Sequence, residues 1–282
     1  MKTITGLLRL YRIDSFLLTV SSFYVTLIIT QGNISEPKNV VLGLLLGVVF
    51  VNFIYSINSY FDADIDSINK PHRPIPSKAI SKFQAGIYIA LLGILSLIMP
   101  LFFIEQKILL LALYAFPIVG VLYSNPFYPL KKNAIAAPLL TTIILTLPAF
   151  IAVLCNNNPQ KYFSYVIIIF FYCLCMVPLK DIEDVEGDAQ FNSDNWATIY
   201  GEKRLVLTSL AGLFIVSAAA FVFRNIPGFI LLSAVFLCAA IVEIIFITKK
   251  LALNKLYKAL ILTNLVMLFA GIMAYITVII FQ

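Results

Sequence analysis

Residues 39–66 read NVVLGLLLGVVFVNFIYSINSYFDADID, an apolar run that ends in a cluster of carboxylates. The apolar part, residues 39–57, is long enough to cross about 30 Å of hydrocarbon as a helix. If the helix continues, the side chains of Asn58, Asp62 and Asp66 recur every four residues and lie on one helix face. The stretch therefore predicts a transmembrane helix with an acidic face at its end.

A second acidic cluster follows the apolar run of residues 162–179 in the same way. Asp181, Asp184 and Asp188 also have helical spacing, so they share one face. Like charges stacked along a helix destabilise it, and a bound cation offsets their repulsion. Ligand sets made only of oxygen favour a hard cation, so we expect Mg²⁺ at both clusters.

The composition is that of a polytopic membrane protein. Hydrophobic residues make up 61% of the 282 residues and charged residues 12%, whereas the apolar share of soluble domains is about one half. Lipid offers no partners to backbone polar groups, so spans this apolar are helices. Nine spans are predicted, at residues 14–31, 39–57, 83–104, 108–124, 134–154, 162–179, 204–223, 227–248 and 258–281. The expected fold is an all-α bundle of nine transmembrane helices, with two cytosolic loops capping a central cavity.

The two acidic clusters occupy matching places in the chain. One closes the second predicted span and the other closes the sixth, four spans later. This placement suggests a duplicated unit. Internal repeats in membrane bundles often face each other across a central site. We expect a single domain, residues 1–282, with pseudo-repeat halves of roughly 1–133 and 134–282.

The positive charges predict the orientation in the membrane. Sixteen of the twenty Lys and Arg residues fall on one side of the nine-span arrangement: Lys2, Arg9, Arg12, Lys70, Arg73, Lys78, Lys82, Lys131, Lys132, Lys180, Lys203, Arg204, Lys249, Lys250, Lys255 and Lys258. By the positive-inside rule, the N-terminus and both acidic clusters are cytosolic and the C-terminus lies outside. The formal charge of +6 thus reflects topology, and no nucleic-acid partner is expected.

Other interpretations of the carboxylates are weaker. An EF-hand calcium loop that starts at Asp62 would need glycine and glutamate where the chain has Ser67 and Arg73, so that interpretation fails. A solvated acidic face does not explain why the cluster recurs at a matching position. A secondary transporter with acidic sites in inverted repeats is the alternative from another class. Transport predicts carboxylates near the bilayer midplane, whereas these lie at span ends beside basic loops.

The motifs also have a family resemblance. Residues 58–66 fit the pattern N-x-x-x-D-x-x-x-D, residues 69–77 read NKPHRPIPS, and residues 181–188 fit D-x-x-D-x-x-x-D. Together with the span count, these motifs resemble those of the UbiA superfamily of intramembrane prenyltransferases. The resemblance extends over the whole chain.

The resemblance implies a reaction and a set of site residues. Members bind a polyprenyl diphosphate, such as geranylgeranyl diphosphate, through Mg²⁺ and transfer the polyprenyl group to a lipophilic acceptor within the membrane. The motifs imply metal ligands at Asn58, Asp62 and Asp66 for one ion and at Asp181, Asp184 and Asp188 for the second. The basic candidates for binding the diphosphate are Arg12, Arg73, Lys78, Lys131 and Lys132. Tyr123 is expected beside the allylic cation or the diphosphate, since aromatic faces stabilise cations.

The acceptor is less closely defined by the resemblance. The sequence RPIPS at residues 73–77 is similar to the branch that alkylates glycerol-phosphate ether-lipid precursors, the digeranylgeranylglyceryl phosphate synthases. The alternatives within the family are a prenyltransferase for aromatic or quinone precursors and a terpene cyclase that ionises its substrate without an acceptor.

Overall fold

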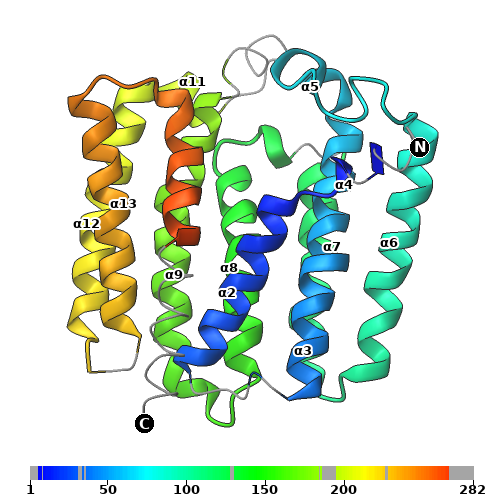
Figure 1. The fold of residues 1–282 in the computed structure, drawn as a ribbon, viewed down its shortest axis with the longest axis horizontal. Helices are drawn as coiled ribbons and strands as arrows, with labels where there is room; N and C mark the ends of the chain where they lie inside the picture. The colour runs from blue at the N-terminus through cyan, green and yellow to red at the C-terminus, as the bar shows by residue number, and fades with distance from the viewer. Residues whose placement is uncertain are drawn as a thin grey trace.

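The computed structural model describes residues 6–7, 9–30, 34, 36–127, 130–183, 185, 195–225 and 228–266, and the regular elements of these residues are all helical (Figure 1). The first elements are α2 (Ile13–Ile29), α3 (Pro37–Leu44), the π-helical stretch η1 (Leu45–Val51), α4 (Asn52–Phe61), α5 (Ala63–Asn69), α6 (Lys82–Phe103) and α7 (Lys107–Ser124). They are followed by η2 (Leu130–Lys132), α8 (Ala136–Leu154), η3 (Pro159–Tyr162), α9 (Phe163–Met176), η4 (Val177–Lys180), α11 (Trp196–Tyr200), α12 (Glu202–Val222), α13 (Phe229–Thr248) and η5 (Leu253–Lys255). Residues 256–266 form a further helical segment.

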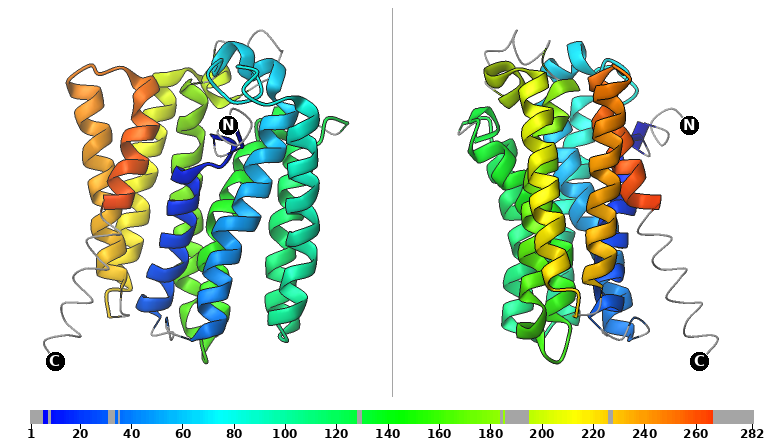
Figure 2. Two further views of the ribbon diagram at one scale, coloured as in Figure 1. Left: turned by 45° about the vertical axis from the view of Figure 1, so that its right-hand side comes forward. Right: turned by 90° about the vertical axis from the view of Figure 1, so that its left-hand side faces the viewer.

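The long helices stand side by side in one bundle. α12 and α13 pack together at one edge and α6 lies at the opposite edge, with α2, α4, α7, α8 and α9 between them (Figures 1 and 2). α5 and α11 lie together at one end of the bundle, while α3 begins at the other end (Figure 1). The first acidic motif, at the junction of α4 and α5, thus lies at one end of the bundle.

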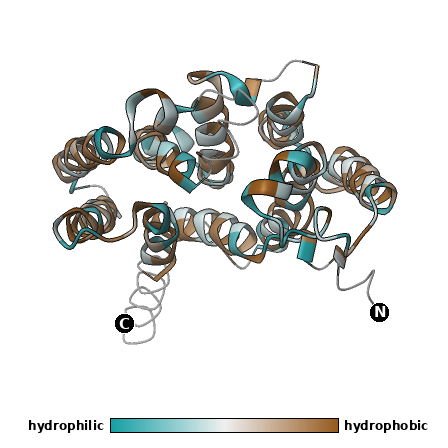
Figure 3. Ribbon diagram, turned by 90° about the horizontal axis from the view of Figure 1, so that it is seen from above, coloured by the Kyte–Doolittle hydropathy of each residue, from teal (hydrophilic) through white to brown (hydrophobic). Residues whose placement is uncertain are grey.

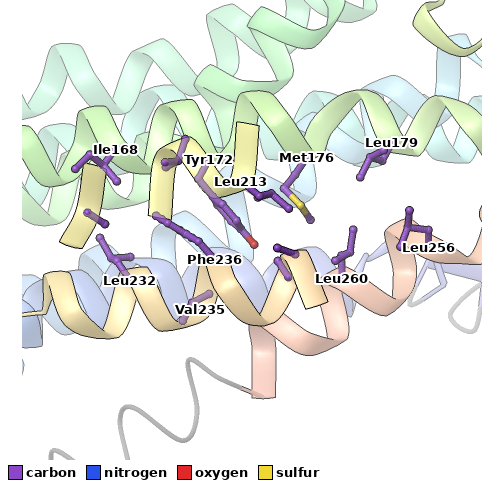
Figure 4. Packing of buried hydrophobic residues seen from close by; sticks show 14 of the residues in the cluster. Ile168, Tyr172, Met176, Leu179, Leu213, Leu232, Val235, Phe236, Leu256 and Leu260 are labelled. Atoms are coloured by element: carbon purple, nitrogen blue, oxygen red, sulfur yellow. The ribbon is translucent and has the colours of Figure 1, made fainter. Parts of the chain in front are cut away.

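The buried side chains form two main clusters. One is built from α3, η1, α4, α7 and α8, and the other from α9, α12, α13 and residues 256–260. In the second cluster the rings of Tyr172 and Phe236 stack with centroids 4.2 Å apart, and Leu256 and Leu260 pack at the same interface (Figure 4). This packing fixes α9, the helix that leads to the second acidic motif, against the α12–α13 pair.

The outer surface of the bundle is apolar. Large hydrophobic side chains such as Phe102 (76% exposed) and Leu101 (63% exposed) point outward from α6, and hydrophobic residues predominate around the bundle when it is viewed from above (Figure 3). Such a surface is stable only in lipid or against a partner. The protein is therefore an integral membrane protein, as the composition predicts.

Most of the predicted spans correspond to helices of the structure. Seven segments of the described chain are long and apolar enough to cross a membrane: Pro37–Phe61, Lys82–Phe103, Lys107–Ser124, Ala136–Leu154, Pro159–Glu183, Glu202–Val222 and Phe229–Thr248. α2 is apolar but has only 17 residues. The predicted span 258–281 lies largely outside the described residues. The all-α class is confirmed.

α4, the helix that leads to the first motif, packs closely against α7. A Cβ atom added at Gly120 of α7 would lie 2.7 Å from Cγ1 of Ile54 in α4, and Ile54 is only 5% exposed. Glycine thus allows the two backbones to approach. The contact joins α4, which ends directly before Asp62, to the helix that carries Tyr123.

We expect Gly120→Ala to destabilise the protein by up to about 2 kcal/mol, since overpacking a core costs roughly 1–3 kcal/mol and the better helix propensity of alanine returns about 1 kcal/mol. Gly86→Ala is the matched control, because a Cβ atom at Gly86 meets only Cε2 of Tyr60, at 3.7 Å. Thermal unfolding of the purified variants in detergent measures both effects. A Gly120→Ala variant as stable as Gly86→Ala would show that the α4–α7 contact is not tight.

Candidate active site

The first acidic motif lies where α4 passes into α5. The helix is interrupted at Asp62, yet the amide of Asp62 donates to the carbonyl of Asn58 at 2.9 Å, and the amide of Asp66 donates to the carbonyl of Asp62 at 2.8 Å. These bonds between residues four apart keep the three side chains in helical register. The Nδ2 atom of Asn58 donates to Oδ2 of Asp62 at 2.7 Å. The carboxylates and the amide of the motif thus lie together.

Each carboxylate of the first motif pairs with a cation from a different loop. Nη1 of Arg73 donates to Oδ2 of Asp66 at 2.5 Å, and the two side chains are only 17% and 5% exposed. The ammonium group of Lys131 pairs with Asp62. Lys131 comes from η2, between α7 and α8. The motif is therefore neutralised by Arg73, close to it in the chain, and by Lys131, distant in the chain.

The loop that carries Arg73 is built from turns. The amide of Arg73 donates to the carbonyl of Lys70 at 2.9 Å, and the amide of Ser77 donates to the carbonyl of Arg73 at 2.9 Å. Lys78 follows with a φ of 58°, a region that non-glycine residues seldom adopt, and its side chain is exposed. Lys132 is exposed as well. Of the basic candidates near the first motif, Arg73 and Lys131 contact its carboxylates, whereas Lys78 and Lys132 face outward.

Arg12 precedes α2 and contacts both an acid and an aromatic ring. Its Nε and Nη2 atoms donate to the two carboxylate oxygens of Asp14, at 3.1 and 2.8 Å, and its guanidinium lies 5.2 Å from the ring centroid of Tyr55. Burial opposes the charged form of Arg12, but the hydrogen bond to Asp14 and the electrostatic interactions with Tyr55, Asp14 and Tyr257 together outweigh it and raise the pKa of the guanidinium. Tyr55 precedes Asn58 by three residues, so Arg12 stands as a permanent cation beside the α4 face that leads to the motif.

Tyr123 has a partner that the sequence did not indicate. Nζ of Lys180 donates to the hydroxyl of Tyr123 at 3.1 Å and to Oγ1 of Thr141 at 3.4 Å, and it lies 5.3 Å from the Tyr123 ring centroid. Charge counting assigns Lys180 to a cytosolic loop. A lone basic residue directly before an acidic motif, at the end of an apolar run, is the one signal that could have singled it out.

The second acidic motif is described only in part. Asp181 follows η4 directly, whereas Asp184 and Asp188 lie outside the described residues. Glu183, which lies between Asp181 and Asp184 in the sequence, pairs with Lys258. Within the described part of the chain no three His, Cys, Asp or Glu side chains converge. Among the described residues, two carboxylates and an amide of the first motif lie together, and an all-oxygen set of this kind would fit Mg²⁺.

An apolar cavity lies between α2, α9, α13 and residues 256–266. Its volume is about 110 Å³, and its lining includes Leu18, Met176, Tyr257 and the stacked ring of Tyr172. The hydroxyl of Tyr172 donates to Oδ1 of Asn264 at 2.6 Å. The cavity is therefore an apolar space among the helices, and its lining does not include the residues of the first acidic motif.

Residues 19–266 match the UbiA prenyltransferase family. The chain belongs to this family. Among its relatives, the digeranylgeranylglyceryl phosphate synthase of Methanosphaera stadtmanae is 29% identical over 171 residues, which cover 61% of this chain and 61% of that protein. The 2-acylphloroglucinol 4-prenyltransferase of Humulus lupulus is 32% identical over 190 residues, 64% of this chain and 45% of that protein. The chain thus spans about three fifths or less of the length of these two relatives.

Solved structures confirm the fold. A UbiA homologue from Archaeoglobus fulgidus, bound to GPP and Mg²⁺, superposes with a TM-score of 0.74 over 96% of this chain and 99% of that chain, at 18% sequence identity. At this identity the match shows a shared UbiA fold. The resemblance inferred from the motifs is therefore confirmed at the level of family and fold.

Proposed function

We propose that the protein transfers a polyprenyl group from an allylic polyprenyl diphosphate to a lipophilic acceptor within the membrane, in a Mg²⁺-dependent reaction. The observation that carries the proposal is the arrangement of the first motif in a UbiA-family chain. Two carboxylates, Asp62 and Asp66, lie at the end of an apolar bundle, each against a cation that an anionic substrate could take over. If the motif were only a solvated acidic helix face, its carboxylates would not need partly buried basic partners.

The metal ligands follow from the two motifs. Asn58, Asp62 and Asp66 would hold one Mg²⁺, and Asp181, Asp184 and Asp188 would hold a second. When bound, the ions supply positive charge that neutralises the diphosphate as it leaves. The solved homologue with GPP and Mg²⁺ supports this assignment by its family and fold.

The remaining site residues bind and orient the diphosphate. Arg73 and Lys131 pair with Asp66 and Asp62, and they would be donors to the diphosphate where metal ions neutralise those carboxylates. Lys78 and Lys132 add positive charge on the exposed side, and Arg12 adds it beside α4. The apolar bundle excludes water, which would otherwise capture the allylic cation. Tyr123 offers its ring face to that cation.

For the acceptor we propose a glycerol-phosphate ether-lipid precursor, because digeranylgeranylglyceryl phosphate synthases are among the relatives. An aromatic acceptor is the second candidate, because a 2-acylphloroglucinol prenyltransferase is a relative as well. A phosphorylated acceptor is an anion and would use cytosol-facing basic residues such as Lys132. A phenol would not need them.

A direct assay tests the reaction and the acceptor. With labelled geranylgeranyl diphosphate and Mg²⁺, we expect the purified protein to release diphosphate and to prenylate geranylgeranylglyceryl phosphate. Prenylation of a hydroxybenzoate or an acylphloroglucinol instead would assign the protein to the aromatic branch. Release of diphosphate with a cyclised hydrocarbon as product would identify a cyclase. Absence of diphosphate release with every acceptor would contradict the proposed function.

For the topology, we propose nine spans, a cytosolic N-terminus and active-site loops, and an external C-terminus. In a variant whose four native cysteines are replaced by alanine, a cysteine at Ser67 is expected to react only from the cytosolic side. One at Pro37 is expected to react only from outside, since α5 and the start of α3 lie at opposite ends of the bundle (Figure 1). Labelling of intact cells with a membrane-impermeant maleimide measures both. Reaction of both cysteines from the same side would contradict this topology.

A further inference from the structure

Lys180 occupies a position unlike that of the other cations of the site. It ends η4, directly before Asp181, and its ammonium group contacts α7 through Tyr123 and α8 through Thr141. Thr141 is the sixth residue of α8, so it lies roughly 8 Å along the helix from its first residue at 1.5 Å per residue. Lys131 belongs to the loop that precedes α8. The ammonium group of Lys180 therefore lies deeper in the bundle than the loop that carries Lys131.

The two hydrogen bonds of Lys180 do not by themselves require a charge, although the Tyr123 ring and the carboxylate of Asp181 favour one. Both hydrogen-bond acceptors, Tyr123 and Thr141, are neutral hydroxyls, and a neutral amide could donate to either one. A charged ammonium inside a membrane bundle is costly and usually has a function. An ammonium group also has three donors, and the two hydroxyls account for two of them. The charge and the third donor are features that an anionic ligand can use.

We propose that Lys180 is a catalytic residue that binds the diphosphate from the membrane side, at the oxygen joined to C1 of the polyprenyl chain. Arg73 and Lys131 approach the same group from the loops at the cytosolic end. This inference rests on the proposed function and adds a residue to its site. Tyr123 and Thr141 are positioning residues in this arrangement, since they hold the ammonium group between α7 and α8.

The role of Lys180 lies in the bond-breaking step. The bond between C1 and the oxygen breaks, and its electron pair moves to the oxygen, which leaves an allylic cation and a diphosphate with one more negative charge. Lys180 donates a hydrogen bond to that oxygen and keeps its proton. The acceptor oxygen then forms a bond to C1, and the proton of its hydroxyl passes to the released diphosphate. A donor aimed at an oxygen that gains charge stabilises the transition state more than the bound substrate.

Lys180→Gln and Lys180→Arg separate charge from packing. Glutamine retains a donor for the two hydroxyls, whereas arginine retains the positive charge. We expect Lys180→Gln to lower kcat about hundredfold, the effect of losing one preorganised donor to developing charge. We expect it to weaken the binding of geranylgeranyl thiolodiphosphate, an unreactive analogue, about tenfold. Lys180→Arg is expected to recover most of both losses.

Lys82→Gln is the matched control, because Lys82 also lies over a tyrosine ring, 5.3 Å from the centroid of Tyr60, but is exposed at the start of α6. It should bind the analogue and turn over as the wild type does. If Lys180→Gln matches the wild type in kcat and analogue binding, or if Lys180→Arg is as impaired as Lys180→Gln, the inference is wrong. A wild-type protein that neither binds the analogue nor releases diphosphate would instead contradict the proposed function itself.

Discussion

Asp62→Asn and Asp66→Asn are each expected to lower turnover at least about hundredfold, the scale of losing a major electrostatic contact in a transition state. Asparagine keeps the shape of the side chain but removes the charge, and charge is what a Mg²⁺ ligand must supply. The release of diphosphate from labelled geranylgeranyl diphosphate measures the effect. The same loss is expected for the wild-type protein when EDTA removes the metal ion.

Asp64→Asn is the control for these variants. Asp64 lies between the two ligands in sequence, but it is exposed on the other side of α5, whereas Asp66 is 4% exposed. Its replacement changes the net charge by the same amount and should leave turnover near that of the wild type. Near-normal turnover of Asp62→Asn and Asp66→Asn would contradict their assignment as metal ligands. An equal loss in Asp64→Asn would mean that the net charge of the segment matters more than individual ligands.

The sequence was sufficient to predict most of the membrane helices and the helical spacing of the first motif. Apolar runs identify membrane helices because lipid imposes one strong requirement on every span, and residues four apart share a face in any helix. The interruption at Asp62 could not be predicted in this way. It leaves the motif intact because the backbone hydrogen bonds between residues four apart continue through it.

The ion-pair partners of the motif carboxylates could not be predicted from the sequence. Arg73 and Lys131 were both expected to bind a diphosphate, and neither was expected to pair with a motif carboxylate. The contact between Lys131 and Asp62 joins residues 69 positions apart, and such a pair depends on how α4, α7 and η2 pack together. The same holds for Lys180 and Tyr123, which are 57 positions apart. Charge counting places a lysine on one side of the membrane but does not say what it contacts.

The pairing of carboxylates with basic side chains also offsets the repulsion within the first motif. Bringing Asp62 and Asp66 together without compensation would be unfavourable, because nearby like charges repel and burial removes water. Lys131 and Arg73 supply that compensation in the described structure. If these carboxylates bind Mg²⁺ as proposed, metal ions and basic side chains compete for them. The thermal stability should then depend on metal in any variant that lacks Arg73 or Lys131.

Arg73→Met is accordingly expected to destabilise the metal-free protein by about 3 kcal/mol, the lower end of the cost of removing one partner from a buried ion pair. Asp66 is left as a buried carboxylate, since its side chain is only 5% exposed in the pair. In EDTA we expect Tm to fall by roughly 6–12 °C, given about 2–4 °C per kcal/mol for a chain of comparable size. Mg²⁺ should raise the Tm of Arg73→Met more than that of the wild type, because the ion replaces the lost positive charge.

The double variant Asp66→Asn, Arg73→Met separates charge from packing. It removes both charges, so it should be more stable in EDTA than Arg73→Met alone and should gain less from Mg²⁺. If Arg73→Met has the wild-type Tm in EDTA, the pair contributes nothing to stability and Asp66 is solvated. If Arg73→Met loses stability but gains no more from Mg²⁺ than the double variant does, Asp66 is not a metal ligand. The thermal measurement therefore tests the role of Asp66 without a substrate and independently of the acceptor.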